Sequence, residues 1–466
     1  MITQQDLKEI ERYVYEIPRE FRADMRVPAR VYASPELMKK IFSDRSLEQL
    51  INTATLPGVE KYVIAMPDIH QGYGCPVGGV VATRADDGII SPGVTGYDIN
   101  CGVRLLATTT EARAVRKRIS TLVDLLFTHI PSGVGGRGPI HLSEGDMAAV
   151  LEQGAAWAVK RGYGEKEDLA RIEEGGSARD AQAEAITDKA RQRGRDELGT
   201  LGSGNHFVEV QRVERILNPD EAERMGVFED QLCFMIHSGS RGLGHQTCTD
   251  YVNICRRAMP QYGIQIPDQE LACVPYQSPE GQAYYHAMRA ATNFAFANRQ
   301  VLSHSVREAW DRAMAGVVKD REVRTIWEVG HNVATLFQHE GKELVVHRKG
   351  AARTEPGKPL LIPGSMGSAS YLLVGTEKAE RETFGTCAHG AGRVMSRAQA
   401  KKRVQGQELR QQLEEQGVLA RTKSYSGLAE EAPFAYKDVD AVIRVVEATG
   451  LARPVARLVP LAVVKG

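Results

Sequence analysis

YVIAMPDIHQGYGCPVGGVVATRADDGIISPGVTGYDINCGVRLL, residues 62–106, is the stretch that decides the class of fold. Short apolar runs such as YVIAM, GGVVAT and GVRLLAT alternate here with segments rich in Gly and Pro. Runs of this length, rich in Val and Ile and bounded by turn residues, predict strands joined by tight turns. Reactive side chains such as Asp98 and Cys101 fall between these runs. Because loops at strand ends commonly present functional residues, we expect the chemistry there.

The rest of the chain adds both helices and strands. Residues up to about 44 are charged and predict helix, and residues 144–194 and 281–315 predict helical insertions, because their apolar residues recur near helical spacing. HFVEVQRV, QLCFMIH, the block from ELVVH to YLLVG and the tail VARLVPLAVVKG predict further strands, and VMSRAQAKKRVQGQELRQQLEEQG predicts a last helix. We therefore predict an α+β fold in which residues 1–466 form a single large mixed-sheet unit, with the active site on loops at strand ends.

The composition is that of an ordinary soluble globular protein, with 42% hydrophobic and 25% charged residues. The 59 Lys and Arg balance the 59 Asp and Glu, which argues against a basic nucleic-acid coat protein or a membrane adhesive. The charged N-terminus and the lack of long apolar runs predict a cytoplasmic protein. The seven scattered cysteines form no CxxC pair, so neither a disulfide framework nor a zinc ribbon is expected.

Five glycine-rich segments carry His, Asp or Cys: YDINCGVR (97–104), GSGNHFVEV (202–210), IHSGSRGLGHQ (236–246), EVGHNVA (328–334) and TCAHGAGRVMSR (386–397). A thiolate, imidazoles and a carboxylate together make a transition-metal site, and by ligand softness alone they favour Zn over Mn or Mg. The candidate ligands are Asp98, Cys101, His206, His237 and His331. The alternative is a set of buried, hydrogen-bonded core residues.

Three segments place Arg or Lys beside Gly, as in phosphate-binding loops: HRKGAAR (347–353), GSRGLG (239–244) and HGAGR (389–393). A solvated turn is the alternative for each. The chain has neither a GxxxxGK[ST] loop nor a Lys-x-Asp-Gly motif. If a covalent nucleotide intermediate forms, His389 is a reasonable nucleophile, because neutral imidazole can attack phosphorus and leave a phosphoramidate.

Taken in order, several blocks resemble those of the RtcB family of RNA ligases. They are MPDIHQGYGCPVGGV, GYDINCGVRLL, GTLGSGNHFVEVQ, IHSGSRGLGHQ, VGHNVA, VHRKGAAR, LIPGSMGSASYLLVG, CAHGAGRVMSR, EEAPFAYKDVD and the terminal VVKG, and they span residues 57–466. The resemblance implies a GTP- and manganese-dependent ligase that joins an RNA 3′-phosphate or 2′,3′-cyclic phosphate to a 5′-hydroxyl. It also implies a guanylyl-histidine intermediate, followed by an RNA 3′-guanylate.

The resemblance assigns roles by position. His389 is the implied nucleophile. By the same resemblance, Cys101 would bridge two manganese ions, with Asp98 and His206 on one ion and His237 and His331 on the other. The implied guanylate contacts are Asn205, His206, Glu209, Ser365, Ser370, Gly390, Ala391, Gly392, Tyr436 and Lys465. Arg241 and Arg393 handle phosphate, and His347, Arg348 and Lys349 form a basic loop for the RNA backbone. Asp68 and His70 belong to a family motif too, with a supporting structural role expected.

Two other functions remain open from the residues. The metal cluster could serve a phosphoesterase that only activates water, or the chain could be a GTP-regulated RNA-binding module without chemistry. The physiological RNA, the need for an activating partner such as an archease, and the oligomeric state are not given by the sequence. Zero net charge does not exclude an enzyme that holds RNA ends, because basic residues concentrate at 113–118, 347–353 and 396–403.

Overall fold

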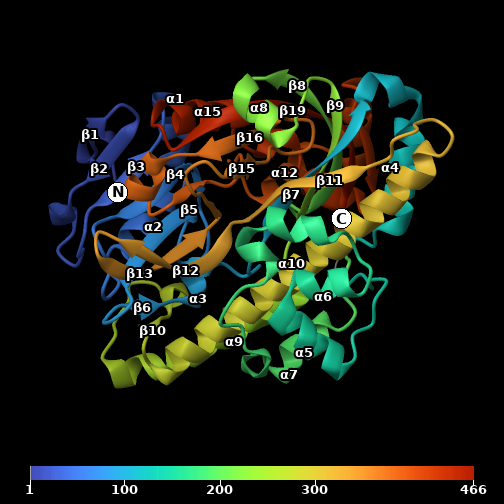
Figure 1. The fold of residues 1–466 in the computed structure, drawn as a ribbon. Coiled ribbons are helices and arrows are strands. Elements are labelled where there is room, and N and C mark those ends of the chain that lie inside the picture. Colours follow the sequence, from blue (N-terminus) through green and yellow to red (C-terminus); the bar gives the residue numbers. More distant parts are fainter. Residues whose placement is uncertain (1, 134) are drawn as a thin grey trace.

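Two large sheets, each with both parallel and antiparallel pairs, organise the computed structural model, which describes residues 2–133 and 135–466 (Figure 1). The first sheet has the order β1 (Lys8–Glu11), β2 (Val14–Ile17), β3 (Ala29–Tyr32), β4 (Val63–His70), β5 (Val77–Arg84), β13 (Lys342–Lys349) and β12 (Asn332–His339). The second has the order β11 (Val323–Gly330), β7 (Gly102–Glu111), β9 (Gln231–Ser238), β8 (Phe207–Ile216), β19 (Ala452–Lys465), β16 (Ser370–Gly375) and β15 (Pro359–Ile362), with β18 (Leu419–Thr422) beside β19. The predicted α+β class is confirmed.

Smaller elements complete the fold. Two short sheets pair β10 (Val274–Pro275) with β6 (Ile89–Ile90), and β14 (Ala351–Arg353) with β17 (Thr386–Ala388). The α-helices are α1 (Pro35–Ile41), α2 (Ser46–Thr53), α3 (Pro92–Thr95), α4 (Ile119–His129), α5 (Glu144–Gln153), α6 (Ala155–Lys160), α7 (Asp188–Gly194), α8 (Pro219–Met225), α9 (Arg241–Ala258), α10 (Pro279–Met314), α11 (Glu377–Glu382), α12 (Arg397–Arg403), α13 (Gly406–Glu415), α14 (Tyr425–Glu430) and α15 (Val439–Ala448). Within the described residues, no helix is both long enough and apolar enough to cross a membrane.

Strand β9 shows how the second sheet is covered on both faces. All of its residues are buried, and alternate side chains enter different hydrophobic clusters. Phe234 belongs to the cluster of α4 and α10, where its ring lies 5.8 Å from that of Trp310, whereas Met235 belongs to the large cluster shared with the first sheet. Successive side chains of a strand point to opposite faces of the sheet. Because both faces are covered here, every residue of β9 is buried, which explains its continuous apolar run.

Helix α10 crosses the molecule beneath the second sheet (Figure 1). It begins where the Ser278 hydroxyl accepts a hydrogen bond from the Gly281 amide, with Pro279 in its first turn. It agrees closely with the helix predicted for residues 281–315. The other predicted insertion, residues 144–194, is expected from its spacing to form two helices but contains three, α5, α6 and α7, with 3-10 turns between α6 and α7.

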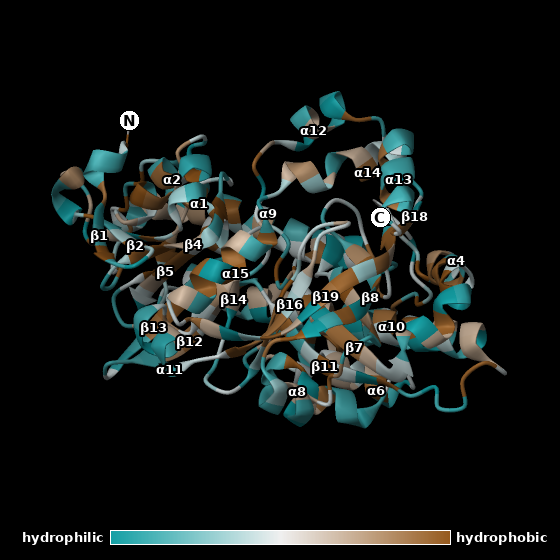
Figure 2. Ribbon diagram, turned by 90° about the horizontal axis from the view of Figure 1, so that it is seen from above, coloured by the Kyte–Doolittle hydropathy of each residue, from teal (hydrophilic) through white to brown (hydrophobic). Residues whose placement is uncertain are grey.

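Two further predictions of secondary structure are wrong. The first residues of the chain form β1 to β3 before α1, because VYEI and ARVY pair side by side and β3 pairs with β4, a partner distant in sequence. The edge strand β1 is exposed throughout, so its charged residues imitate a polar helix. The predicted helix at 394–417 is interrupted at Val404, whose backbone is extended, and forms α12 and α13. Figure 2 shows these two helices with α14 on the opposite side of the sheets from α8 and α11.

A buried network of charges joins α10 to the second sheet. Glu328 of β11 lies 2.5 Å from Nε of Arg104 in β7 and 2.8 Å from Nη2 of Arg299 in α10, and all three side chains are fully buried. Arg104 also donates to Gln300 and Ser303 of the same helix. Removing the shared carboxylate would leave two buried guanidinium groups without their counter-charge.

Glu328→Gln is therefore expected to lower the free energy of unfolding by roughly 3–5 kcal/mol, the range for breaking a buried ion pair. Urea unfolding monitored by tryptophan fluorescence measures it. Glu111→Gln is a matched control, because Glu111 pairs with Arg113 at the surface, where the side chains are 43% and 74% exposed, and should show no measurable change. Equal effects of the two substitutions would show that the buried network does not stabilise the fold.

Candidate functional site

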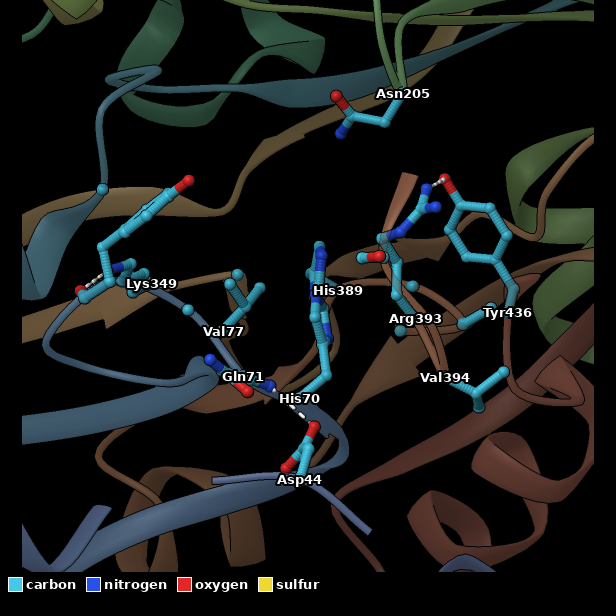
Figure 3. A pocket seen from close by; sticks show the side chains of 18 of the residues that line it. Asp44, His70, Gln71, Val77, Asn205, Lys349, His389, Arg393, Val394 and Tyr436 are labelled. Atoms are coloured by element: carbon cyan, nitrogen blue, oxygen red, sulfur yellow. Dashed lines mark hydrogen bonds between the residues drawn. The ribbon is translucent and has the colours of Figure 1, made fainter. Parts of the chain in front are cut away.

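A cleft of about 1710 Å³ is lined by residues from both large sheets. Figure 3 shows His389 in the middle of this cleft, with Lys349 on one side, Arg393 and Tyr436 on the other, and Asn205 facing it from a separate loop. Most of the site residues predicted from the sequence lie in or directly behind its wall.

The five predicted metal ligands meet behind His389 in two overlapping groups: Cys101, His237 and His331, and Asp98, Cys101 and His206. In the first group the Cys101 thiol lies 3.3 Å from His237 Nε2, which lies 3.3 Å from His331 Nε2. In the second, Cys101 lies 3.3 Å from His206 Nε2, which lies 2.9 Å from Asp98 Oδ2. Cys101 is the member common to both.

Strand pairing brings these ligands together. Gly102, at the start of β7, pairs with Ser238 of β9 on one side and with Gly330 of β11 on the other. Cys101, His237 and His331 are the chain neighbours of these three paired residues, so they converge at one end of the sheet. Gly102 has no room for a side chain, because a Cβ there would lie 2.5 Å from a carbonyl oxygen of β11.

Helix α10 donates hydrogen bonds to the backbone beside Cys101 and His237. Arg299 donates to the carbonyl oxygens of Asn100 and Ser238 at 2.7 and 2.8 Å, and so fixes the residues next to Cys101 and His237. Asn298 donates to the Gly239 carbonyl at 3.1 Å. The buried charge network that joins α10 to the sheet thus also positions the candidate metal ligands.

The protonation of the cluster suits a cation. Burial lowers the pKa of His237 and His331 well below the ordinary imidazole value, so both rings are neutral near pH 7 and can donate a lone pair. His206 Nδ1 lies 3.0 Å from the Leu201 carbonyl, which leaves Nε2 free as a ligand. Burial raises the pKa of the Cys101 thiol well above its usual value, and a bound cation would reverse this by stabilising the thiolate. The donor set fits a transition metal.

His389 follows the short strand β17 and faces the cleft from beside the metal cluster. Its Nδ1 lies 2.5 Å from Oδ2 of Asp68, and its ring centroid lies 4.8 Å from that of His331. The same Asp68 oxygen accepts hydrogen bonds from the amides of His389 and Gly390 at 3.1 Å. Burial alone would raise the pKa of Asp68, but the contacts with His389 outweigh it and lower that pKa. Asp68 therefore fixes both the backbone and the ring of His389.

Sequence analysis gave Asp68 only a supporting role and did not identify its partner. The signal that could have found it is the carboxylate in PDIH, near the end of the predicted strand, but its partner is 321 residues away in the chain. The segment that carries His389 can approach Asp68 closely because a glycine follows at position 392. Gly392 has a φ of +73°, and a Cβ there would lie 2.0 Å from the Asp68 carbonyl oxygen.

On the other side of His389, the fully buried Glu431 organises the basic residues of the cleft. It lies 3.0 Å from Arg393 Nη1 and 2.7 Å from Arg397 Nε, and it accepts a hydrogen bond from the Tyr436 hydroxyl. Ser365 donates to its backbone carbonyl. Sequence analysis missed Glu431, because nothing in EEAPFAY distinguishes it from a surface acid.

Glu209 and Lys465 lie together deeper in the wall. Burial raises the pKa of Glu209 to about 7, and one of its carboxylate oxygens has no hydrogen-bond partner. Burial lowers the pKa of Lys465 to about 8, against the attraction of Glu431 and Glu209. Gln211 bridges Glu209 and Ser370, donating to them at 2.7 and 3.1 Å. A buried carboxylate with a free acceptor, close to a buried amine, is suited to the polar edge of a planar ligand.

The predicted phosphate-handling residues have different surroundings. Arg241 donates to Thr200 and lies 3.4 Å from His206, so it belongs beside the metal cluster. The prediction that His347, Arg348 and Lys349 form a basic loop is wrong, because they end strand β13 and are buried. His347 contacts the backbone at Val81 and Ser91, and Arg348 donates to hydroxyl and carbonyl groups of the protein. Lys349 lines the cleft but donates to the carbonyls of Tyr73 and Gly93.

Comparison with known proteins gives a consistent picture. The family model described as tRNA-splicing ligase RtcB matches residues 49–466. The tRNA-splicing ligase RtcB of Thermococcus kodakarensis is 50% identical and that of Archaeoglobus fulgidus 46% identical, each over 99% of both chains. The RNA-splicing ligase RtcB of Mycobacterium tuberculosis is 47% identical over 90% of this chain and 100% of its own.

The cluster geometry predicts that Co²⁺, added as a probe, gives a thiolate-to-cobalt charge-transfer band through Cys101. Cys101→Ala should abolish this band, because Cys101 belongs to both ligand groups. Cys255→Ala is the matched control, since Cys255 is equally buried but lies in the hydrophobic packing of α9. Absorption spectroscopy during a Co²⁺ titration measures the band, and a band that persists in Cys101→Ala would place the metal elsewhere.

Proposed function

The chain belongs to the RtcB family, and we propose that it is a GTP-dependent RNA ligase that joins an RNA 3′-phosphate or 2′,3′-cyclic phosphate end to a 5′-hydroxyl end, in tRNA splicing or RNA repair. The observation that carries the proposal is the position of His389. One ring nitrogen is held by Asp68, and the ring stands in a large cleft between a metal-ligand cluster and a group of basic residues.

The proposed reaction begins with an attack of His389 Nε2 on the α-phosphorus of GTP. The bond to the β-phosphate oxygen breaks, pyrophosphate leaves, and GMP remains on the histidine as a phosphoramidate. An oxygen of the RNA 3′-phosphate then attacks the same phosphorus and displaces His389, which gives an RNA 3′-guanylate. Finally the 5′-hydroxyl of the second strand attacks the 3′-phosphate phosphorus and GMP leaves. A 2′,3′-cyclic end is first opened by water to the 3′-phosphate.

Asp68 has a defined part in this reaction. Its carboxylate faces His389 Nδ1, so it fixes the tautomer in which Nε2 carries the lone pair, and it stabilises the positive charge that develops on the ring during attack. The buried position of Asp68 strengthens this interaction relative to one in water. Orientation of a nucleophile by a fixed carboxylate is the general arrangement of activated histidines and serines.

Two manganese ions are part of the proposal. Cys101, His237 and His331 would hold one, and Asp98, Cys101 and His206 the other. When bound, such ions supply positive charge that polarises phosphoryl oxygens and stabilises the entering and leaving oxygens. The softness of the ligands alone would favour zinc, so the choice of manganese rests on membership of the family.

The guanylate is proposed to lie on the Tyr436 side of the cleft. Glu209 and Lys465 offer an acceptor and a donor for the guanine edge, and Arg393 offers a guanidinium to a phosphate. The remaining proposed contacts come from the loops around these residues: Asn205, His206, Ser365, Ser370, Gly390, Ala391, Gly392 and Tyr436. Arg241, which lies next to His206, is proposed to assist phosphate binding from the metal side.

A cytoplasmic location is also proposed, supported by the seven buried cysteines, all of which are free thiols, as in a reducing compartment.

An archease-type activator is a possible partner in the proposed reaction. Multiple turnover by the purified chain alone would show that such an activator is not needed. The alternative phosphoesterase would use only the metal cluster and would leave the Asp68–His389 pair without a role.

Incubation with α-labelled GTP and Mn²⁺ tests the mechanism. The wild-type protein should retain label after denaturation, in a bond that is lost in acid and stable in alkali. His389→Ala should retain none, and Asp68→Asn should label roughly 10²- to 10⁴-fold more slowly, because the ring loses its orienting charge. His141→Ala is the matched control, since His141 is an exposed histidine outside the cleft. Unlabelled wild-type protein, or label that persists in His389→Ala, contradicts the mechanism.

The pH dependence of GTP binding tests the guanine contacts. The Glu209 carboxylate accepts more strongly from guanine when ionised, and its pKa of about 7 means that this contact weakens as the pH falls through 7. The Lys465 charge is lost as the pH rises through about 8. The affinity for GTP should therefore be highest between about pH 7 and pH 8.

Dissociation constants for GTP measured from pH 6 to pH 9 give this profile. Glu209→Gln should bind more weakly above pH 7 and should lose the acid limb. The ionisation of GTP itself is common to both proteins and cancels in the comparison. A wild-type acid limb that is unchanged in Glu209→Gln would remove Glu209 from the guanine site.

A further inference from the structure

Three aromatic side chains form a continuous group on the wall of the cleft opposite the proposed guanylate side. The ring of Tyr73 meets that of Tyr97 edge to face at a centroid distance of 6.3 Å, and Tyr97 packs against His245 at 5.1 Å with an interplanar angle of 36°. All three line the cleft. Tyr73 is 71% exposed, the highest value among the exposed large hydrophobic residues of the described chain. The proposed guanylylation uses none of them.

The group is held in place although its outer ring is exposed. The Tyr73 carbonyl accepts a hydrogen bond from Lys349, and the Tyr97 hydroxyl donates to Glu270 at 2.9 Å, whose other oxygen is held by Arg256 at 2.7 Å. The loop between β4 and β5, which carries Tyr73, packs tightly against Glu270. Its Gly74 has a φ of +68°, and a Cβ there would lie 2.8 Å from the Glu270 side chain, so the backbone cannot move closer. An exposed aromatic ring on a fixed backbone is preorganised for a flat ligand.

The position of the group relates it to the reacting centre. Tyr97 directly precedes the metal-ligand candidate Asp98, and His245 lies in the second turn of α9, which begins at Arg241. Lys349, which bonds to Tyr73, lies on the opposite side of His389 from Arg393 and Tyr436 (Figure 3). A ligand on these rings would therefore approach His389 and the metal cluster from the side away from the proposed guanylate site.

The surroundings are suitable for a nucleotide. Burial and the positive charge of Arg193 lower the pKa of His245, so its ring is neutral near pH 7 and stacks without the cost of desolvating a charge. Arg193, which donates to Gln246 next to His245, places a positive charge near the aromatic group. Aromatic side chains next to positive charge are the usual elements that bind single-stranded RNA, because every base presents a flat face.

We propose that Tyr73, Tyr97 and His245 form a stacking platform for the unpaired base of an RNA end, and that this platform delivers the terminal phosphate or hydroxyl to His389 and the metal cluster. The proposal rests on the proposed RNA ligase function and adds to it a binding subsite for the RNA strand. The platform is tolerant of base identity, because it offers faces and edges of rings instead of a base-specific set of hydrogen bonds. Ligation should thus require an unpaired terminal base.

Two short single-stranded RNAs test the platform in the full-length protein without GTP. One carries 2-aminopurine as its last nucleotide and ends in a 3′-phosphate, and the other carries 2-aminopurine as its first nucleotide and begins with a 5′-hydroxyl. Stacking should quench the fluorescence of the probe in at least one strand, and the strand that is quenched identifies which end the platform holds. Anisotropy of the same strands gives their affinities.

Tyr73→Ala should abolish the quenching and weaken the binding of that strand by roughly 5- to 100-fold, the effect of losing one base–aromatic stack. Tyr73→Phe should restore both, because it restores the ring. Tyr425→Ala is the matched control, since Tyr425 is a 40% exposed tyrosine that lies outside the cleft. Thermal midpoints should be alike in all four proteins, because the Tyr73 side chain is exposed.

Two results would overturn the platform, and they differ in what they say of the proposed function. If the wild-type protein ligates the two RNAs with GTP and Mn²⁺ but Tyr73→Ala shows wild-type quenching and affinity, the platform is wrong and the ligase proposal stands. If the wild-type protein neither binds nor ligates either RNA, both proposals fail. Replacing the terminal base with an abasic nucleotide should weaken wild-type binding as much as Tyr73→Ala does, and equal binding of the abasic strand also contradicts the platform.

Discussion

The buried contact between Arg299 and Glu328 is the interaction on which the site most depends. Burying charged groups is unfavourable unless they are paired and their remaining donors are satisfied. Here the pairing places Arg299 so that its other donors reach the carbonyls of Asn100 and Ser238, which lie next to the candidate ligands Cys101 and His237. Glu328 itself lies on β11, three residues before His331, which follows the strand. One polar cluster inside the core therefore sets both the position of α10 and the spacing of the candidate metal ligands.

The second constraint is the pairing of strand β7 with both β9 and β11, which converts distant segments of sequence into one cluster. His389 reaches this cluster from a different, smaller sheet, and its orientation comes from Asp68 on the first large sheet. The cleft is therefore formed only when both large sheets and the small sheet of β14 and β17 are in place. The walls of the cleft differ in kind: the candidate metal ligands and the aromatic rings lie on one side of His389, and Glu431 with its basic partners lies on the other.

The sequence predicted which reactive side chains gather at the cleft better than it predicted their surroundings. The candidate metal ligands and His389 were identifiable because each lies in a glycine-rich segment at a strand end, a local signal. Asp68, Glu431 and Arg299 were not, because their roles come from partners that only the fold brings near. The prediction that HRKGAAR forms a basic loop was wrong for the same reason. His347 and Arg348 are buried within β13 because neighbouring strands pair with it on both sides, which the local sequence does not show. The first strands were mistaken for helix, because an exposed edge strand carries helix-like charges.

Crystals of the protein soaked with GTP and Mn²⁺ give the most direct measurement of the central claim, that His389 accepts a nucleotide between Asp68 and a metal cluster built on Cys101. We expect continuous density from His389 Nε2 to the α-phosphorus of GMP, Asp68 retained at Nδ1, and anomalous manganese peaks beside Cys101. Intact GTP bound away from His389, or manganese located only outside the Cys101 cluster, would contradict it.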